Sequence, residues 1–223
     1  EYVHTVSSHL FDYKSSLPAS FKDALIDFIR TTKSHVATLN YDKLLYEAFI
    51  DANICSGFSG QLVDGFTSSG FDSSNLARKY GRSFGYYMHL HGSPLFKDIN
   101  NITYKLQTSQ ISTSNIFSSR HVVLTHIPHK PNVITASAIL STYWNYMILA
   151  LSEVDEIILF GYSGCDTHLN NVLKIHANSK NKKIIEWSGD SFTTQQRQDF
   201  WDKELGNNVT LQRMSDITNF TSW

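Results

Sequence analysis

Apolar runs with the length of strands alternate with helical patterns along most of this chain, and this alternation constrains the possible folds most strongly. The clearest strand is Glu156–Phe160, whose unbroken apolar run is typical of a parallel strand covered on both faces. Further strands are predicted at His35–Leu39, Tyr86–Leu90, Lys183–Trp187 and Val209–Leu211. Strands and helices that alternate at this spacing predict an α/β fold: a doubly wound, Rossmann-like, mostly parallel sheet with helices on both faces.

The helical patterns support one compact domain. The first predicted helix is capped by Ser20 and carries an apolar face. The other predicted helices are 43–50, 136–151, 168–174 and 193–205. A chain of 223 residues is long enough for one sizeable core, so we expect residues 1–223 to form a single Rossmann-type domain. Segments 51–85 and 94–135, with their Gly-, Ser- and Thr-rich stretches, are predicted to be insertions or a lid.

Composition narrows the classes of partner. Charged residues make up 17% of the chain and its net charge is −1. Because nucleic-acid binding depends on an excess of Lys and Arg, we expect neither direct nucleic-acid binding nor attraction to an acidic membrane. The longest apolar-leaning segment, 146–151, is far shorter than the ~20 residues of a membrane span. No signal peptide is visible, and these features together predict a cytoplasmic protein.

Neither the cysteines nor the histidines predict a metal site. The two cysteines, Cys55 and Cys165, form no Cys-x-x-Cys pair, so the pattern fits neither a zinc module nor a disulfide scaffold. The ten histidines are scattered singly along the chain. We therefore expect no metal.

Three predicted strands end on small, polar or ionisable residues. The segments are Thr38–Asp42, His89–Ser93 and Phe160–Asp166. In an open parallel sheet the carboxyl ends of the strands face one crevice, and ligands bind there. The sequence therefore predicts one polar site assembled from distant segments.

His91 and Asn40 are the candidate catalytic residues. An imidazole suits proton transfer near neutral pH, although a lone His at a strand end is often structural. His89 is predicted to lie deeper and to be structural. The Asn40 carboxamide could bind a ribose hydroxyl or hold a water molecule, or it could satisfy only the local turn. Asp42 could serve the site, cap the following helix, or do both.

Small residues after the later strands suggest a phosphate or ribose cradle. Gly161 allows close approach to the backbone, and the helix after Asp166 offers free N–H groups to an anion. The segment Gly161–Cys165 also mimics the Gly-x-Ser-x-Gly turn of hydrolases, but Cys165 replaces the last Gly, which disfavours a nucleophile at Ser163. Cys165 itself is expected to be buried, because unpaired cysteines usually are.

A second candidate binding segment directly follows a later predicted strand. Ser188 and Asp190 follow Lys183–Trp187, and small polar and acidic residues at such a position commonly hold the adenosine of a dinucleotide. A plain turn is the alternative interpretation.

Taken together, these motifs resemble the sirtuin-like superfamily. Thr38–Leu45 is similar to its Thr-x-Asn-x-Asp-x-Leu signature, and Leu90–Ser93 is similar to its catalytic His-Gly motif. Phe160–Asp166 resembles the Gly-x-Ser turn of the bacterial branch. The resemblance runs from about residue 35 to residue 190.

The resemblance implies an NAD+ hydrolase that cleaves the nicotinamide–ribose bond. The bacterial branch with Asn-Tyr-Asp consists largely of NAD-depleting effectors of anti-phage defence. Asn40 would position the water or the nicotinamide ribose, and His91 would act as a base or contact the ribose. The other residues of the site would hold the remainder of the NAD+ substrate: Thr38, Asp42, Gly92, Ser93, Gly161, Ser163, Asp166, Ser188 and Asp190.

One family element does not appear in the sequence. The Gly-Ala-Gly-x-Ser loop that wraps the NAD pyrophosphate should lie well before Asn40, yet only 39 residues precede Asn40 and no Gly occurs before Gly57. The loop is therefore expected either to lie outside this chain or to have been lost together with full NAD binding.

That departure keeps a second function open. The alternative is a catalytically degenerate domain that senses NAD or ADP-ribose, or that serves as an assembly module. Protein deacylation is a third possibility, but no Cys lies between Ser93 and Phe160 to build the four-Cys zinc ribbon of the family's deacylases. The resemblance also implies a homo-oligomer and an ATPase or sensor protein as partner.

Overall fold

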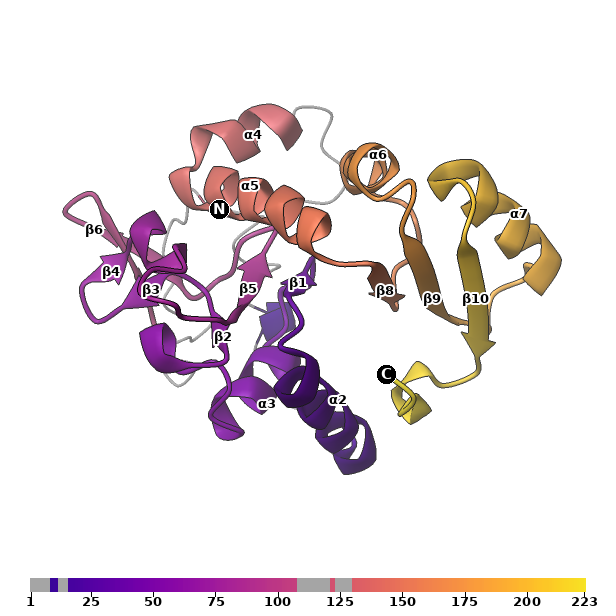
Figure 1. The fold of residues 1–223 in the computed structure, drawn as a ribbon, viewed down its shortest axis with the longest axis horizontal. Helices are drawn as coiled ribbons and strands as arrows, with labels where there is room; N and C mark the ends of the chain where they lie inside the picture. Colours follow the sequence, from indigo (N-terminus) through magenta and orange to yellow (C-terminus); the bar gives the residue numbers. More distant parts are fainter. Residues whose placement is uncertain (1–8, 12–15, 108–120, 123–129) are drawn as a thin grey trace. The chain divides into compact units, whose positions relative to one another are not determined.

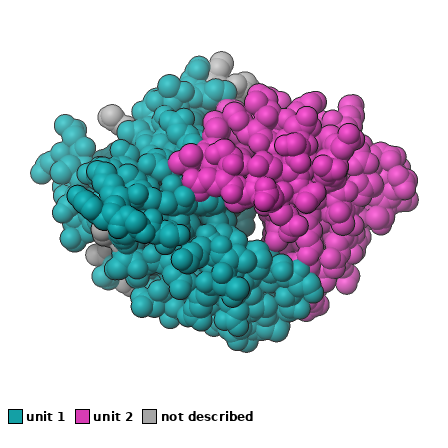
Figure 2. Space-filling model, viewed as in Figure 1, with its two compact units in different colours: residues 1–146, 221–223 teal, residues 147–220 magenta. Residues whose placement is uncertain are grey.

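The computed structural model describes residues 9–11, 16–107, 121–122 and 130–223 (Figure 1). The chain divides into two compact units, of which unit 1 holds residues 1–146 and 221–223 and unit 2 holds residues 147–220 (Figure 2). Each unit contains helices and a three-stranded parallel sheet, which confirms the predicted α/β class. A single doubly wound sheet stays a prediction.

The sheet of unit 1 has the strand order β1-β5-β2. Its strands are β1 (Val36–Thr38), β5 (Gly85–His89) and β2 (Leu62–Val63). Every residue of the central strand β5 is buried, and Thr38 of β1 pairs with His89 of β5. The predicted strand that leads into His91 is therefore confirmed, and it occupies the centre of its sheet.

The other elements in the described part of unit 1 are helices, 3-10 turns and two antiparallel hairpins. The helices are α2 (Ala19–Thr32), α3 (Leu44–Asp51), α4 (Lys130–Ala136) and α5 (Ala138–Glu153), whose last residues belong to unit 2. The hairpins are β3 (Phe66–Thr67) with β4 (Gly70–Phe71), and β6 (Phe96–Ile99) with β7 (Ile102–Lys105). Two 3-10 turns are η1 (Gly57–Ser59) and η2 (Ser73–Leu76). Segment 51–85, predicted to be an insertion or a lid, contains short strands and 3-10 turns, whereas much of segment 94–135 lies outside the described residues.

Helix α2 begins earlier than the sequence suggested. It starts at Ala19 directly after Pro18, so Ser20 lies inside the first turn and the predicted Ser20 cap is wrong. Proline lacks an N–H and has a fixed φ, which makes it a favourable residue at a helix start. The apolar face is as expected, because Phe21, Leu25 and Ile29 are buried. At the end of the chain, the Trp223 ring packs 5.4 Å from the ring of Phe21.

Unit 2 contains a parallel sheet with the order β10-β9-β8. Its elements are β8 (Glu156–Phe160), α6 (Thr167–His176), β9 (Asn181–Trp187), α7 (Thr194–Leu205), β10 (Val209–Met214) and the 3-10 turn η4 (Ile217–Asn219). Central β9 contributes the fully buried residues Ile184 and Ile185 to a core that also contains Trp201 of α7. Strand β8 is an edge strand in which only Leu159 is buried, so the expectation that both of its faces are covered is wrong.

Both helices of unit 2 have side-chain caps. The Asp166 carboxylate caps α6, accepting hydrogen bonds from the backbone N–H groups of His168 and Leu169, both at 3.1 Å. Thr193 and Gln196 form a capping box at the start of α7. These caps satisfy N–H groups that a helix start otherwise leaves unpaired. The N–H groups of His168 and Leu169, expected to be free for an anion, are therefore already bonded to Asp166.

Among the described residues, none of the helices alone is both long and apolar enough to cross a membrane. Helices α4 and α5 reach the required length and composition only as a pair, and they are bent by 106° relative to each other.

Candidate functional site

In unit 1 the parallel pairing of β1 with β5 brings the Asn40 and His91 turns together. Thr38 pairs with His89, and the Leu90 N–H donates a hydrogen bond of 3.0 Å to the Thr38 carbonyl oxygen. Asn40 and His91 each follow their paired residue by two positions. The ring centroid of Tyr41 lies 6.2 Å from that of His91. The structure thus places two of the three predicted strand-end motifs side by side.

His91 is completely buried, and its Nε2 lies 2.6 Å from Nζ of Lys130, the first residue of α4. This distance is that of a hydrogen bond between the two side chains. Lys130 is itself buried. No local pattern in the sequence signalled this residue, because it lies 39 positions from His91 and inside a predicted insertion.

The turn after His91 is more closely packed than expected. Gly92 has a φ of 80°, and a Cβ atom placed there would lie 1.5 Å from the carbonyl oxygen of His121. Ser93 is buried, and its hydroxyl accepts a hydrogen bond of 3.3 Å from the Leu95 N–H. The backbone at His121 therefore fills the space beside Gly92, and contact of Gly92 or Ser93 with a ligand stays a prediction.

The turn after β1 is more open. Asn40 is exposed, and its backbone N–H donates a hydrogen bond of 3.1 Å to the Thr38 hydroxyl. Asp42 accepts a hydrogen bond of 3.0 Å from the N–H of Leu44, the first residue of α3. The Asp42 side chain thus bonds the first N–H group of α3, although the capping position itself is Lys43. Contact of Thr38 or Asp42 with a ligand stays a prediction.

Unit 1 also contains a buried ionic cluster that the sequence analysis did not predict. Lys105 of β7 and Asp64 form an ion pair whose side chains are only 8% and 5% exposed. The Lys105 ammonium also lies 4.0 Å from the ring centroid of Tyr46. Burial first, and then the Asp64 carboxylate, raise the pKa of the Cys55 thiol to about 12. Cys55 therefore stays protonated near neutral pH and is a poor nucleophile.

His89 makes unit 1 sensitive to acid. It is buried among aromatic rings, and neither of its ring nitrogens has a hydrogen-bond partner within the described part of the chain. Burial, assisted by the Lys105 charge, holds its pKa well below the ordinary value of 6.5. Below about pH 6.5 the unfolded chain binds a proton at His89 that the folded chain does not, so a fall in pH favours the unfolded state. The free energy of unfolding therefore decreases by about 1.4 kcal/mol for each pH unit below that value.

We therefore expect His89→Phe to have a shallower decline in the free energy of unfolding between pH 6.5 and pH 5 than the unmodified protein. Urea denaturation at several pH values measures this difference, and comparing slopes cancels the contribution of the carboxylates. Equal slopes would contradict the role given to His89.

In unit 2 the turn after β8 places the predicted glycines in a tight bend. Gly161 has a φ of 64°, and its N–H donates a hydrogen bond of 2.9 Å to the carbonyl oxygen of Ile185 in β9. Ser163 is exposed, and its carbonyl oxygen accepts a hydrogen bond of 2.9 Å from Arg197 Nη2. Asp166 is buried as the α6 cap. Binding of a ligand by Gly161, Ser163 or Asp166 stays a prediction.

The loop after β9 lies at the same end of this sheet. The Ser188 N–H donates a hydrogen bond of 2.8 Å to the Met214 carbonyl oxygen at the end of β10. The carboxylate of exposed Asp190 accepts hydrogen bonds from Arg213 and from the Phe192 N–H. The hydrogen bond from Arg213 is the main reason that the pKa of Asp190 is lowered. Asp190 is thus held as an anion, although its role towards a ligand stays a prediction.

The hydrolase alternative gains no support from this turn. Gly164 has a φ of 83°, and a Cβ atom there would lie 2.6 Å from the Phe200 ring, so this glycine is explained by packing. Cys165 is exposed, and the expectation that it is buried is wrong. It directly precedes Asp166, whose carboxylate turns inward to cap the helix.

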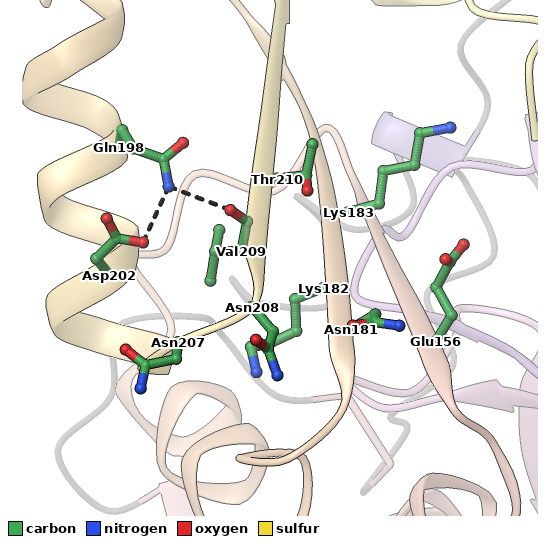
Figure 3. Close-up of a pocket in the computed structure, with 10 residues that line it drawn as sticks. All are labelled: Glu156, Asn181, Lys182, Lys183, Gln198, Asp202, Asn207, Asn208, Val209 and Thr210. Atoms are coloured by element: carbon green, nitrogen blue, oxygen red, sulfur yellow. Dashed lines mark hydrogen bonds between the residues drawn. The ribbon is translucent and has the colours of Figure 1, made fainter.

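Two surface pockets lie away from the predicted residues. One, of about 530 Å³, lies at the amino ends of the unit 2 strands (Figure 3). It is lined by Glu156, Asn181, Lys182, Lys183, Gln198, Asp202, Asn207, Asn208, Val209 and Thr210. The other, of about 590 Å³, lies in unit 1 beside the β3–β4 hairpin. Neither pocket is lined by a predicted site residue.

Lys182 lines the first pocket, but its ammonium group is bonded to the backbone of its own unit. Its Nζ donates hydrogen bonds of 2.9–3.2 Å to the carbonyl oxygens of Ala177, Asn178 and Lys180. These carbonyls follow the end of α6, where the helix dipole also favours a cation. Lys182 therefore stabilises the helix end.

In the described ranges, no three His, Cys, Asp or Glu side chains are grouped so as to hold a metal ion. Comparison of the chain with models of known protein families and with curated proteins found no match.

Proposed function

We propose that the protein is an NAD+ hydrolase that cleaves the bond between nicotinamide and ribose. The observation that carries this proposal is the adjacency of the Asn40 and His91 turns at the carboxyl ends of two paired parallel strands. Ligands of parallel α/β sheets bind at this end. The resemblance of both turns to sirtuin-like motifs supports the choice of NAD+ as substrate.

Cleavage of the nicotinamide–ribose bond mainly requires the protein to orient its substrate. The bond breaks through an oxocarbenium-like state, so the site must orient NAD+, exclude bulk water and place one water molecule at the anomeric carbon. Exposed Asn40 offers a carboxamide for the water or the ribose. His91 contacts the ribose, and proton transfer through its Nε2 requires the Lys130 contact to open.

The polar turns of unit 2 are proposed, from the same resemblance, to bind NAD+. Gly161 and Ser163 provide a tight turn after β8, and Ser188 and Asp190 provide polar groups after β9. An anionic carboxylate such as that of Asp190 is suited to accept hydrogen bonds from ribose hydroxyls. We further propose that the activity is cytoplasmic and serves anti-phage defence in an oligomer with a sensor or ATPase partner.

The test is the release of nicotinamide by the full-length protein. Asn40→Ala and His91→Gln are expected to lower the rate by at least about 100-fold, a typical effect of removing a group that acts in the transition state. Asn171→Ala and His176→Ala, exposed residues of α6, are the matched controls and should retain the rate. Thermal unfolding of each variant establishes that the fold is kept, and wild-type release by both site variants would rule out the assignment.

A binding module is the second candidate, and one observation favours it. His91 is fully buried with its Nε2 already engaged by Lys130, an arrangement that suits a structural residue as well as a catalytic one. Calorimetry with NAD+ and with ADP-ribose separates the two functions. Tight binding without nicotinamide release would favour the sensor over the hydrolase.

A further inference from the structure

A buried carboxylate at the carboxyl end of the unit 2 sheet accepts hydrogen bonds from two side chains and forms an ion pair with a third. Glu186 of β9 is 5% exposed. Arg197 of α7 donates to it through Nε and Nη2, at 2.7 and 2.8 Å, and Trp201 donates through its indole N–H at 2.8 Å. The guanidinium of Arg213 in β10 lies 3.1 Å away through Nε. Two arginines therefore share one buried anion.

Each of these arginines also reaches a different loop. Arg197 Nη2 donates to the Ser163 carbonyl oxygen at 2.9 Å, in the turn after β8. Arg213 donates to the Asp190 carboxylate and, through Nη1 at 2.6 Å, to the Phe192 carbonyl oxygen, both in the loop after β9. Glu186 therefore links two loops that are separate in sequence and that carry exposed polar residues.

The geometry of this cluster, which we call the Glu186 clamp (Glu186, Arg197, Arg213 and Trp201), is suited to rigid positioning. The planar fork of Arg197 meets both carboxylate oxygens, and its guanidinium carbon lies 4.5 Å from the Phe200 ring centroid. Fork-to-carboxylate pairs fix orientation as well as distance, which a Lys ammonium cannot do. The hydrogen bonds to Glu186 raise the pKa of Arg197 above its ordinary value.

We propose that Glu186, Arg197 and Arg213 are positioning residues, Arg197 for the Ser163 turn and Arg213 for the Asp190 loop, that hold these two segments in the geometry that binds the dinucleotide. This inference rests on the proposed function for the identity of the ligand. Because the clamp acts on loops assigned to binding, its loss raises the KM for NAD+ and leaves kcat nearly unchanged. It also loosens both loops in the absence of any ligand.

The experiment compares Arg197→Lys, Glu186→Gln and Trp201→Phe in the full-length protein. Arg197→Lys keeps the positive charge and loses the fork, and Trp201→Phe removes a single hydrogen bond from Glu186. The matched control is Gln198→Ala, the next residue of α7, whose amide bonds Asp202 and the Val209 carbonyl oxygen at the far end of the sheet (Figure 3). Hydrogen exchange of residues 161–164 and 188–190 is measured without ligand, and KM and kcat are measured by nicotinamide release.

We expect exchange of residues 161–164 to accelerate by about 10-fold in Arg197→Lys, and exchange of both loops to accelerate by about 10-fold in Glu186→Gln. The KM rises by about 10-fold in both variants, with kcat within about 3-fold and the control unchanged. Should Glu186→Gln fail to fold, Arg197→Lys and Trp201→Phe carry the test. Unchanged exchange in both loops would overturn the proposal, and so would a fall in kcat at constant KM. If both loops loosen while the unmodified protein neither binds nor cleaves NAD+, the positioning role is supported and the proposed function fails.

Discussion

Replacing Lys105 by Met is expected to lower the free energy of unfolding by about 3–5 kcal/mol. Lys105 and Asp64 form an ion pair in which both side chains are almost fully buried. Although burial lowers the pKa of Lys105, the neighbouring Asp64 carboxylate outweighs this effect and the pKa is raised. Without the ammonium, the Asp64 carboxylate is left as an unpaired charge in a site that water does not reach. Urea denaturation at neutral pH measures the loss.

A double variant separates charge from packing. Asp64→Asn keeps an oxygen for the Phe66 N–H, which donates to Asp64 at 3.0 Å, while it removes the negative charge. Lys105→Met combined with Asp64→Asn is therefore expected to recover much of the stability lost in Lys105→Met alone, because no buried charge remains. If the two single losses simply add, the loss in Lys105→Met comes from packing and the ion-pair interpretation is wrong.

Elements of this fold that depend only on residues close together in the sequence could be predicted. The strand Glu156–Phe160 matches β8 in its bounds, and the Asp166 cap follows from a carboxylate placed just before an apolar helical pattern. Burial of β8 could not be predicted, because an apolar run does not reveal whether a strand is central or at an edge. The failed cap at Ser20 shows the same limit, since Pro18 offered a competing helix start.

The candidate site was predictable only in part, for a similar reason. Asn40 and His91 could be paired because the strand ends of a parallel sheet meet at one edge. The partners of these turns come from far along the chain: Lys130 lies 39 positions from His91, and Lys105 lies 41 positions from Asp64. Nothing in the local pattern around a lone lysine distinguishes a buried partner from a solvated one, so these contacts became visible only with the fold.

Substitution of Gly92 is the second change expected to lower the stability of the fold strongly. Gly92→Ala is expected to lower the free energy of unfolding by about 2–5 kcal/mol, which combines the cost of a left-handed backbone with that of overpacking. Its φ is 80°, and the added Cβ would lie 1.5 Å from the His121 carbonyl oxygen and 3.2 Å from the Val122 Cα. Since these are backbone atoms, no side-chain rotation can relieve the contact.

Gly81→Ala provides the matched control for this prediction. Gly81 has a comparable φ of 72°, but a Cβ atom there meets nothing within 4 Å. The control therefore carries only the backbone cost of about 1–2 kcal/mol. The difference between the two variants in urea denaturation isolates the contact with the His121 backbone. If Gly92→Ala costs no more than Gly81→Ala, the backbone at His121 does not pack against the turn, and the packing given to Gly92 is wrong.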